Sequence, residues 1–280
     1  MRFGKYQGIG NDFVMLSDPE DRLRLTPELV RSLCDRRTGV GADGVIRVAP
    51  GIDGADFFMD HVNSDGTTSE MCGNGIRCLA IFAADEGLSA EEQLKVMTRA
   101  GLKVVERSGT KVRVDMGAPM FAPAEVPINW SGDDALEARL DLDGKEVALA
   151  AVSLGNPHAV LFVPEIERAP VTTLGPRLET HPAFPNRTNV EFAVVETPER
   201  IRMRVWERGA GETMACGTGA CAVAVVARLR AGTSERVTVA LPGGELEVAW
   251  AGDLEREAPV YMTGPAVRSF VGEVEIEDVG

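Results

Sequence analysis

The pattern of apolar and polar residues predicts strands around a buried helix in each half of the chain. Three segments, 111–116, 202–206 and 236–241, alternate apolar and polar residues as half-buried strands do. Two other runs, 76–84 and 220–227, are interpreted as apolar on every face, and their alanine content favours helix. A helix that is apolar all round is buried all round. We therefore expect each half to be a mostly antiparallel sheet wrapped around a central helix.

Local signals predict one further helix and a linker. Thr26 is a typical N-cap residue and Pro27 suits the first helical position, so a short helix is expected to run to Cys34. Three prolines within 119–127 follow the first half of the chain. Because proline interrupts regular structure, this segment is interpreted as an inter-domain linker.

The chain contains two copies of one motif. Cys72-Gly-Asn-Gly and Cys216-Gly-Thr-Gly each precede an alanine-rich apolar run, and they lie 144 residues apart. Gly10-Asn11 and Gly155-Asn156 repeat with an offset of 145 residues. Two repeats in nearly the same register indicate an internal duplication, with a period far too long for a solenoid.

The duplication predicts an α+β protein of two pseudo-symmetric domains, each a mostly antiparallel sheet or barrel around a central helix. A length of 280 residues also fits two domains. The N-terminal domain is expected over 1–118 and the C-terminal domain over 119–263. A last strand over 264–280 is expected to return to the first domain.

Charge and composition exclude several classes of protein. The chain carries 29 basic and 43 acidic residues, a net charge of −14, which disfavours binding to nucleic acid or to an anionic membrane. It has no run of eighteen apolar residues and no recognisable signal peptide. Five cysteines are too sparse for a secreted disulfide scaffold, so a cytoplasmic protein is expected.

The two repeated cysteines stand where a helix is predicted to begin. Backbone N–H groups there lack internal partners and the helix dipole is positive, so each motif predicts an anion site beside a thiol. The same setting is expected to lower the pKa of Cys72 and Cys216. A carboxylate bound there would place its α-carbon next to the sulfur. Cys34, Cys78 and Cys221 are interpreted as buried apolar residues.

Two such thiols predict an amino-acid racemase or epimerase that works without a cofactor. If both halves share one site, one thiolate removes the α-proton and the opposite thiol returns a proton to the other face. A dithiol redox protein and a non-catalytic amino-acid binder remain alternatives. No metal site is expected, because there is no Cys-x2-Cys pair and the histidines, His61, His158 and His181, are far apart.

Short motifs are spread along most of the chain, at 8–13, 39–44, 63–66, 71–78, 153–158, 188–192, 206–213, 215–220 and 261–266. Taken in this order, they resemble the motifs of the diaminopimelate epimerase family. The resemblance implies interconversion of LL- and meso-2,6-diaminopimelate in lysine biosynthesis, by a homodimer, without pyridoxal phosphate or metal. Related epimerases of proline and hydroxyproline are the alternative, and Asn11, Asn63 and Trp206-Glu-Arg favour diaminopimelate.

The resemblance also implies roles for particular residues. Cys72 and Cys216 would be the acid/base pair, tuned by His158 and Glu207. Gly44 stands where some members have Gln, so a side-chain contact there is lost or replaced. Residues expected to bind the reacting carboxylate are Gly73, Asn74, Gly217 and Thr218. The remaining substrate contacts are expected from Asn11, Asn63, Asn156, Asn189, Glu207, which would pair with an ammonium, and Arg208, whose planar fork suits the distal carboxylate.

Overall fold

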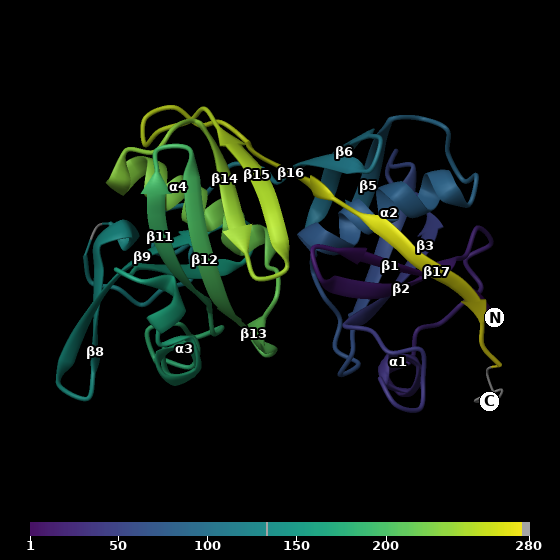
Figure 1. Cartoon of the computed structure of the whole chain (residues 1–280), viewed down its shortest axis with the longest axis horizontal. Helices are drawn as coiled ribbons and strands as arrows, with labels where there is room; N and C mark the ends of the chain where they lie inside the picture. The colour runs from purple at the N-terminus through teal and green to yellow at the C-terminus, as the bar shows by residue number, and fades with distance from the viewer. Residues whose placement is uncertain (133, 276–280) are drawn as a thin grey trace. The chain divides into compact units, whose positions relative to one another are not determined.

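The computed structural model describes residues 1–132 and 134–275, and the chain divides into two compact units (Figure 1). Unit 1 comprises Met1–Val114 and the C-terminal stretch that begins at Thr263, and unit 2 is Asp115–Met262. The domain boundary expected after residue 118 therefore falls inside unit 2. Residues 276–280 of the expected last strand lie outside the described residues.

Unit 1 pairs its strands in the order β17–β1–β2–β3–β4–β5–β6–β7. Neighbours are antiparallel except β2–β3 and β4–β5, which are parallel. Helix α1 (Pro27–Cys34) connects the first parallel pair and α2 (Gly73–Asp85) the second. The strands are β1 (Arg2–Gly8), β2 (Asn11–Ser17), β3 (Gly44–Pro50), β4 (Phe57–Asn63), β5 (Gln93–Thr98), β6 (Gly101–Ser108), β7 (Lys111–Asp115) and β17 (Val267–Glu273). Strand β16 (Val260–Pro265) pairs with β7.

Unit 2 repeats this pairing. Its order is β8–β9–β10–β11–β12–β14–β15, and only β10–β11 and β12–β14 are parallel. Helix α3 (Val171–Glu179) connects the first parallel pair, and α4 (Gly217–Ala231) lies within the second connection. The strands are β8 (Ala138–Leu142), β9 (Lys145–Ser153), β10 (Pro157–Phe162), β11 (Asn189–Thr197), β12 (Arg200–Glu207), the short β13 (Gly211–Thr213), β14 (Arg236–Leu241) and β15 (Gly244–Trp250). Two 3-10 turns, Ala135–Glu137 and Ile166–Arg168, complete the unit.

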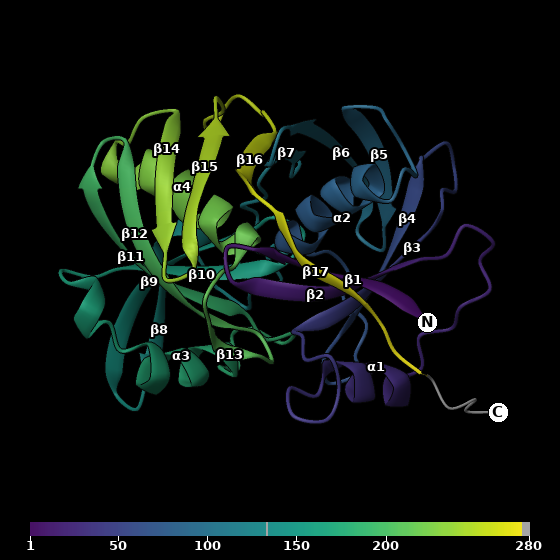
Figure 2. The same ribbon diagram turned by 45° about the vertical axis from the view of Figure 1, so that its right-hand side comes forward.

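The central helix of each unit packs against strands on several sides. Helix α2 contacts β1, β2, β6 and β17, and α4 contacts β9, β11, β12 and β15 (Figure 2). Strand pairing from β1 to β6 is reproduced from β9 to β15, with the long helix in the same connection. The predicted α+β, pseudo-symmetric fold is confirmed, as are the three predicted strands and the helix that begins after Thr26.

Of the two central helices, α4 agrees with the prediction of a helix that is apolar and buried on every face, and α2 differs from it. Helix α4 is buried on every face from Gly217 to Ala227. It ends at Ala231 and is followed by Gly232, whose φ of 67° suits a left-handed C-cap. Helix α2 is not apolar all round, because it contains Arg77, whose side chain is completely buried. That guanidinium is hydrogen-bonded to the Gly73 carbonyl (3.0 Å) and the Asn74 side chain (2.8 Å), which offsets the cost of burial.

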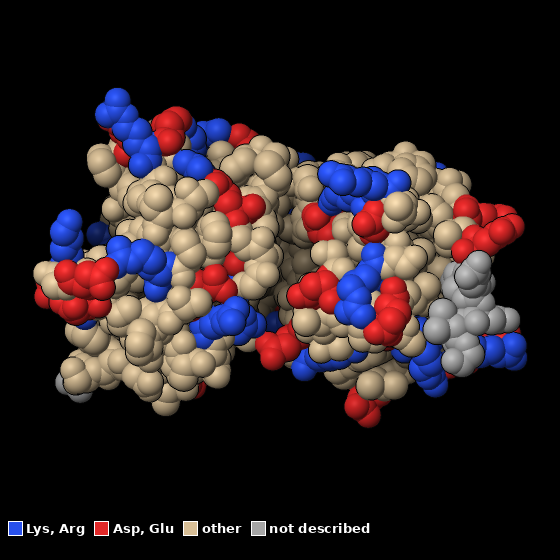
Figure 3. Space-filling model, turned by 90° about the horizontal axis from the view of Figure 1, so that it is seen from below, with Lys and Arg blue, Asp and Glu red and all other residues tan. Residues whose placement is uncertain are grey.

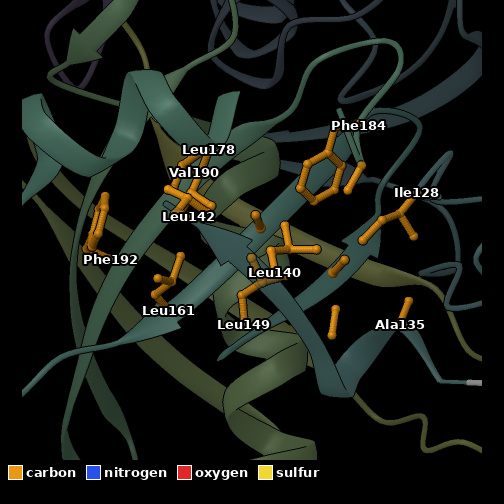
Figure 4. Packing of buried hydrophobic residues seen from close by; sticks show 14 of the residues in the cluster. Ile128, Ala135, Leu140, Leu142, Leu149, Leu161, Leu178, Phe184, Val190 and Phe192 are labelled. Carbon is orange, nitrogen blue, oxygen red and sulfur yellow. The ribbon is translucent and has the colours of Figure 1, made fainter. Parts of the chain in front are cut away.

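The proline-containing segment expected to be a linker belongs to the core of unit 2. Val126 and Ile128 are buried in a cluster with Leu178 of α3, with Leu140 and Val190 of the strands, and with Phe184 of the loop after α3 (Figure 4). The linker prediction was wrong because proline disfavours regular structure but does not prevent its neighbours from packing.

Charged side chains of both signs are interspersed on the face shown in Figure 3. Ion pairs within one unit include Arg139 with Glu146 (2.7 Å) and Arg200 with Glu245 (2.7 Å). Of the helices in the described part of the chain, none is long and apolar enough to cross a membrane.

Candidate functional site

Each repeated cysteine occupies the N-cap of the central helix in its unit. Cys72 has φ −133° and ψ 113°, and its Sγ accepts a hydrogen bond from the Gly75 N–H at 3.3 Å. Cys216 has φ −130° and ψ 110°, and its Sγ accepts from the Gly219 N–H at 3.4 Å. A side-chain acceptor at the N-cap satisfies one of the free amides at a helix start. The two motifs are therefore the same local structure, built once in each unit.

The third residue of each helix is glycine because the space beside it is filled. A Cβ at Gly75 would lie 2.6 Å from Ile46 Cδ1 and 3.5 Å from Cys72 Sγ. A Cβ at Gly219 would lie 2.8 Å from a Glu191 carboxylate oxygen and 3.2 Å from Cys216 Sγ. Glycine at this position lets neighbouring strands approach the thiol closely.

In unit 1 the structure brings Asn11, Cys72 and Asn74 together. Asn11 Oδ1 lies 3.8 Å from Cys72 Sγ and accepts from Asn74 Nδ2 at 3.2 Å. Asn11 Nδ2 donates to Asp43 Oδ2 at 2.7 Å. Gly73, the first residue of α2, completes the amide-rich end of the helix.

Asn63 ends β4, directly opposite Gly44 in β3. Its Nδ2 donates to Thr67 Oγ1 at 3.1 Å, so the side chain is held against the loop that leads to α2. A Cβ at Gly44 would lie 2.7 Å from His61 Nε2 and 2.9 Å from the Val62 carbonyl oxygen. The His61 ring therefore occupies the space that a side chain at position 44 would need.

His61 is a buried histidine on β4. Its ring packs edge-on against Phe13, with centroids 5.4 Å apart, and neither ring nitrogen has a hydrogen-bond partner within the described residues. Burial lowers the pKa of His61 to about 4, with a smaller contribution from the nearby Arg99.

In unit 2 a chain of polar contacts leads to Cys216. His158 Nδ1 lies 2.7 Å from Glu191 Oε1, and its Nε2 lies 3.0 Å from Asn156 Oδ1. Asn156 Nδ2 donates to Thr218 Oγ1 at 3.4 Å, and that oxygen lies 3.6 Å from Cys216 Sγ. Both His158 and Glu191 are fully buried. The structure therefore places His158 within reach of the second helix start through Asn156 and Thr218.

Glu207 lies beside Cys216. Burial raises the pKa of Glu207 to about 7, opposed by hydrogen bonds from Thr213 Oγ1 and from Cys216. Burial also raises the pKa of Cys216 well above its usual value, and the Glu207 and Glu191 carboxylates raise it further. Burial and the two carboxylates outweigh the hydrogen bonds of the Gly219 N–H and the Thr218 hydroxyl, which lower the pKa. The prediction of a lowered pKa was therefore wrong for Cys216.

The turn after β12 is held by Asn189. Its Oδ1 accepts from the Arg208 N–H at 2.9 Å, and its Nδ2 donates to the Pro157 carbonyl at 3.0 Å. The Arg208 guanidinium donates to the Asn186 carbonyl at 3.4 Å and, in the described part of the chain, is paired with no carboxylate. Its charge is therefore open to an anionic ligand.

The other three cysteines, Cys34, Cys78 and Cys221, are buried. Burial raises the pKa of Cys34 to about 11 and that of Cys78 to about 12. Among the residues described, no group of three or more His, Cys, Asp or Glu side chains could hold a metal ion.

Comparison with known proteins identifies the family. Residues 3–122 and 150–269 match the sequence profile of the family described as diaminopimelate epimerase. The chain belongs to the diaminopimelate epimerase family. The resemblance seen in the sequence is thus confirmed over both halves.

Relatives named diaminopimelate epimerase match this family member along its whole length. The one from Desulfitobacterium hafniense is 48% identical over 286 residues, and the one from Synechococcus elongatus is 45% identical over 280 residues; each alignment covers 99% of both chains. Solved structures share the fold at lower identity. A probable proline racemase from Agrobacterium radiobacter K84 has a TM-score of 0.73 at 16% identity, covering 99% of this chain and 94% of its own. A hydroxyproline epimerase from Agrobacterium vitis has a TM-score of 0.72 at 16% identity, covering 98% and 90%.

Three residues of this diaminopimelate epimerase family member were missed as site residues in the sequence. Asp43 and Glu191 lie within the matching stretches 39–44 and 188–192, yet neither was assigned a role. A signal existed for Glu191, because a lone carboxylate between Val190 and Phe192 in a buried strand must find a polar partner. His61 carried no such signal. Its closeness to Gly44 depends on the pairing of β3 with β4, which the sequence alone did not predict.

Proposed function

We propose that this protein interconverts LL- and meso-2,6-diaminopimelate, with Cys72 and Cys216 as its two acid/base residues and without pyridoxal phosphate or metal. The observation that carries the proposal is the duplicated thiol at a helix N-cap, with backbone torsions that agree within a few degrees. The names of the full-length relatives supply the substrate.

In the proposed reaction, one sulfur acts as a base and the other as an acid. A thiolate takes the α-proton and becomes a thiol, which leaves the electron pair on the α-carbon and its carboxylate. The opposite thiol then gives its proton to the other face and becomes a thiolate. Gly73 and Asn74, with Gly217 and Thr218, would bind the carboxylate through helix-start amides and stabilise the developing charge.

Glu207 and His158 are proposed to adjust the Cys216 side of this reaction. A carboxyl group whose pKa is about 7 can exchange a proton with the adjacent thiol near neutral pH. His158, buried against Glu191, holds Asn156 and through it the Thr218 hydroxyl near the sulfur. Cys216 is therefore expected to rest as the thiol in the free enzyme.

Substrate choice is proposed to depend on the turn after β12. Arg208 offers two parallel N–H donors to the distal carboxylate, and Asn189 fixes the backbone of that turn. Glu207 would accept from an ammonium group. Asn11, Asn63 and Asn156 add neutral hydrogen-bonding groups that suit a zwitterion. Proline and hydroxyproline lack the distal amino-carboxylate and are expected to be poor substrates.

We further propose that the two units are two epimerase domains, and that the protein acts in lysine biosynthesis as a cytoplasmic homodimer. The repeated strand pairing supports the two domains, and the family name supports the pathway. Sedimentation analysis of the purified protein would test the dimer.

The decisive experiment is exchange of solvent deuterium into LL-diaminopimelate, followed by mass spectrometry. Wild-type protein is expected to incorporate deuterium at one α-carbon and to form the meso isomer. Cys72→Ala and Cys216→Ala should each abolish epimerisation, whereas Cys34→Ala, which removes a buried thiol of unit 1, should retain it. Epimerisation by either site variant would refute the two-base mechanism. Exchange with proline but not diaminopimelate would favour a proline racemase, and activity that requires the oxidised thiols would favour a redox protein.

A further inference from the structure

A row of polar contacts leads from the surface of unit 1 to the Cys72 thiol. Arg36 Nη2 is 2.7 Å from Asp43 Oδ1. The other carboxylate oxygen, Asp43 Oδ2, accepts from Asn11 Nδ2 at 2.7 Å. The opposite end of that amide, Asn11 Oδ1, lies 3.8 Å from Cys72 Sγ, within range for a sulfur donor. Asp43 thus contacts the thiol only through Asn11 in this row.

The orientation of the Asn11 amide follows from its neighbours. A carboxylate ion-paired with arginine has only acceptor oxygens, so the NH2 group of Asn11 must face Asp43. On the other side, Asn74 Oδ1 accepts from Arg77 Nη2 at 2.8 Å, which turns the Asn74 NH2 group towards Asn11 at 3.2 Å. Both neighbours therefore direct Asn11 Oδ1 towards the sulfur.

We infer that Asp43 is a positioning residue for Cys72: through Asn11 it keeps an acceptor oxygen at the sulfur, so that the thiol proton points to Asn11. The Gly75 N–H contacts the same sulfur at 3.3 Å as a donor. The acceptor favours the thiol and the donor favours the thiolate, so Asn11 and Gly75 oppose one another. This inference deepens the proposed function and rests on it for the role of Cys72.

The rest of the network explains why Asp43 can hold this position. It precedes β3, and its Oδ2 also accepts from the Asp12 N–H at 3.2 Å. Arg36 bridges to Asp12 as well, with Nη2 2.7 Å from Asp12 Oδ1, and Lys5 Nζ lies 2.7 Å from the other Asp12 oxygen. Asp43 is thus fixed by the backbone of β2 and by a guanidinium, while its Oδ2 receives the Asn11 amide.

The test is the pH dependence of alkylation of Cys72 in the full-length chain. All variants carry Cys216→Ser, and the rate of iodoacetamide labelling at Cys72 is measured by peptide mass spectrometry from pH 6 to 10. Asp43→Ala removes the acceptor of the Asn11 NH2 group, so only Asn74 still orients this amide and the contact of Asn11 Oδ1 with the thiol weakens. The apparent pKa of Cys72 should fall by about one unit, which gives roughly tenfold faster labelling below that pKa.

Two controls separate positioning from charge and from loop damage. Removal of the Asp43 charge would also favour a thiolate, but that contribution persists in an Asn11→Ala background, whereas positioning disappears there. We expect Asp43→Ala to change labelling at least threefold less in that background. Within the described residues, the Asp35 carboxylate, which belongs to the same loop, accepts hydrogen bonds only from Arg37 and Thr38. Asp35→Ala should therefore leave the labelling of Cys72 unchanged.

The inference is overturned if Asp43→Ala leaves the labelling profile unaltered, if the same shift persists without Asn11, or if Asp35→Ala reproduces it. Should Asp43→Ala fail to fold, Asp43→Leu, which is close in size, carries the same expectation. Labelling needs no diaminopimelate, so a negative result here leaves the deuterium exchange experiment unaffected and distinguishable.

Discussion

Protonation of His61 should destabilise unit 1 in mildly acidic solution. The ring is buried, its nitrogens have no hydrogen-bond partner among the described residues, and its pKa is lowered to about 4. In the unfolded chain a histidine has a pKa of about 6.5. Between these values the unfolded state binds more protons than the folded state, so stability is present above pH 6.5 and is lost as the pH falls towards 4.

The magnitude follows from the two pKa values. At pH 5 the unfolded histidine is almost fully protonated and the folded one almost fully neutral, which costs about 2 kcal/mol relative to pH 7.5. The complete loss below pH 4 would be about 3 kcal/mol. Arg99 and Asp60 face the ring with opposite effects on its pKa, and burial exceeds both.

The assay compares His61→Phe with wild type at pH 7.5 and pH 5. Phenylalanine keeps a ring against Phe13 and cannot be protonated. All three tryptophans lie in unit 2, so fluorescence would not report on unit 1. Hydrogen exchange of β4 and α2 peptides gives the opening free energy of unit 1 directly.

The quantity of interest is a double difference: the change in opening free energy between pH 7.5 and pH 5 in wild type, minus the same change in His61→Phe. It separates His61 from the other titrating groups. Glu207 acts in the opposite direction, because its raised pKa makes folding more favourable below pH 4.5 and less so as the pH rises through about 7. Groups common to both proteins cancel. A double difference of about 2 kcal/mol is expected, and a value below about 0.5 kcal/mol would refute the assignment of a neutral buried ring.

Three further outcomes are expected. Gly219→Ala places a Cβ 2.8 Å from a Glu191 oxygen, so overpacking of about 1–3 kcal/mol should outweigh the better helix propensity of alanine. The variant should show a lower thermal midpoint and slower incorporation of solvent deuterium into diaminopimelate. Arg208→Lys keeps the charge but loses the bidentate fork, and kcat/KM for diaminopimelate should fall roughly tenfold or more; normal turnover would exclude Arg208 as the distal anchor. Thr213→Val removes a hydrogen bond that lowers the pKa of Glu207, so the Glu207-dependent limb of the pH–rate profile should move to higher pH, whereas a limb that stays in place would assign it to another group.

The features that the sequence predicted well are local and repeated. A cysteine before Gly-x-Gly and an alanine-rich run specifies an N-cap and a buried helix from adjacent residues, and the second copy supports the first. Thr26 with Pro27 likewise specifies a helix start from two neighbours. Strand pairing was out of reach, because parallel pairs such as β2–β3 and β10–β11 join residues separated by a whole helix.

Polar residues that find distant partners were predicted poorly. The guanidinium of Arg77 is buried because it meets carbonyl and amide oxygens at the start of its own helix and the Pro265 carbonyl from the far end of the chain (3.3 Å). Cys216 shows the same limit. The helix-start argument counts nearby amides, whereas burial raises the pKa of Cys216 and the carboxylates of Glu207 and Glu191, from β12 and β11, raise it further.

The duplication preserved the backbone of the two thiol motifs while their polar surroundings diverged. Cys72 lies near a neutral amide held by Asp43, whereas Cys216 lies near two carboxylates. Under the proposed mechanism this difference has a reason. Epimerisation inverts one carbon of diaminopimelate and leaves the distal centre unchanged, so the two directions of the reaction are not mirror images. A site that recognises one fixed distal end must carry its anchor in one unit. Unit 2 carries Arg208, which is paired with no carboxylate among the described residues. A pseudo-symmetric reaction on an asymmetric substrate therefore requires two thiol motifs with the same backbone but with different polar and ionisable groups around each sulfur.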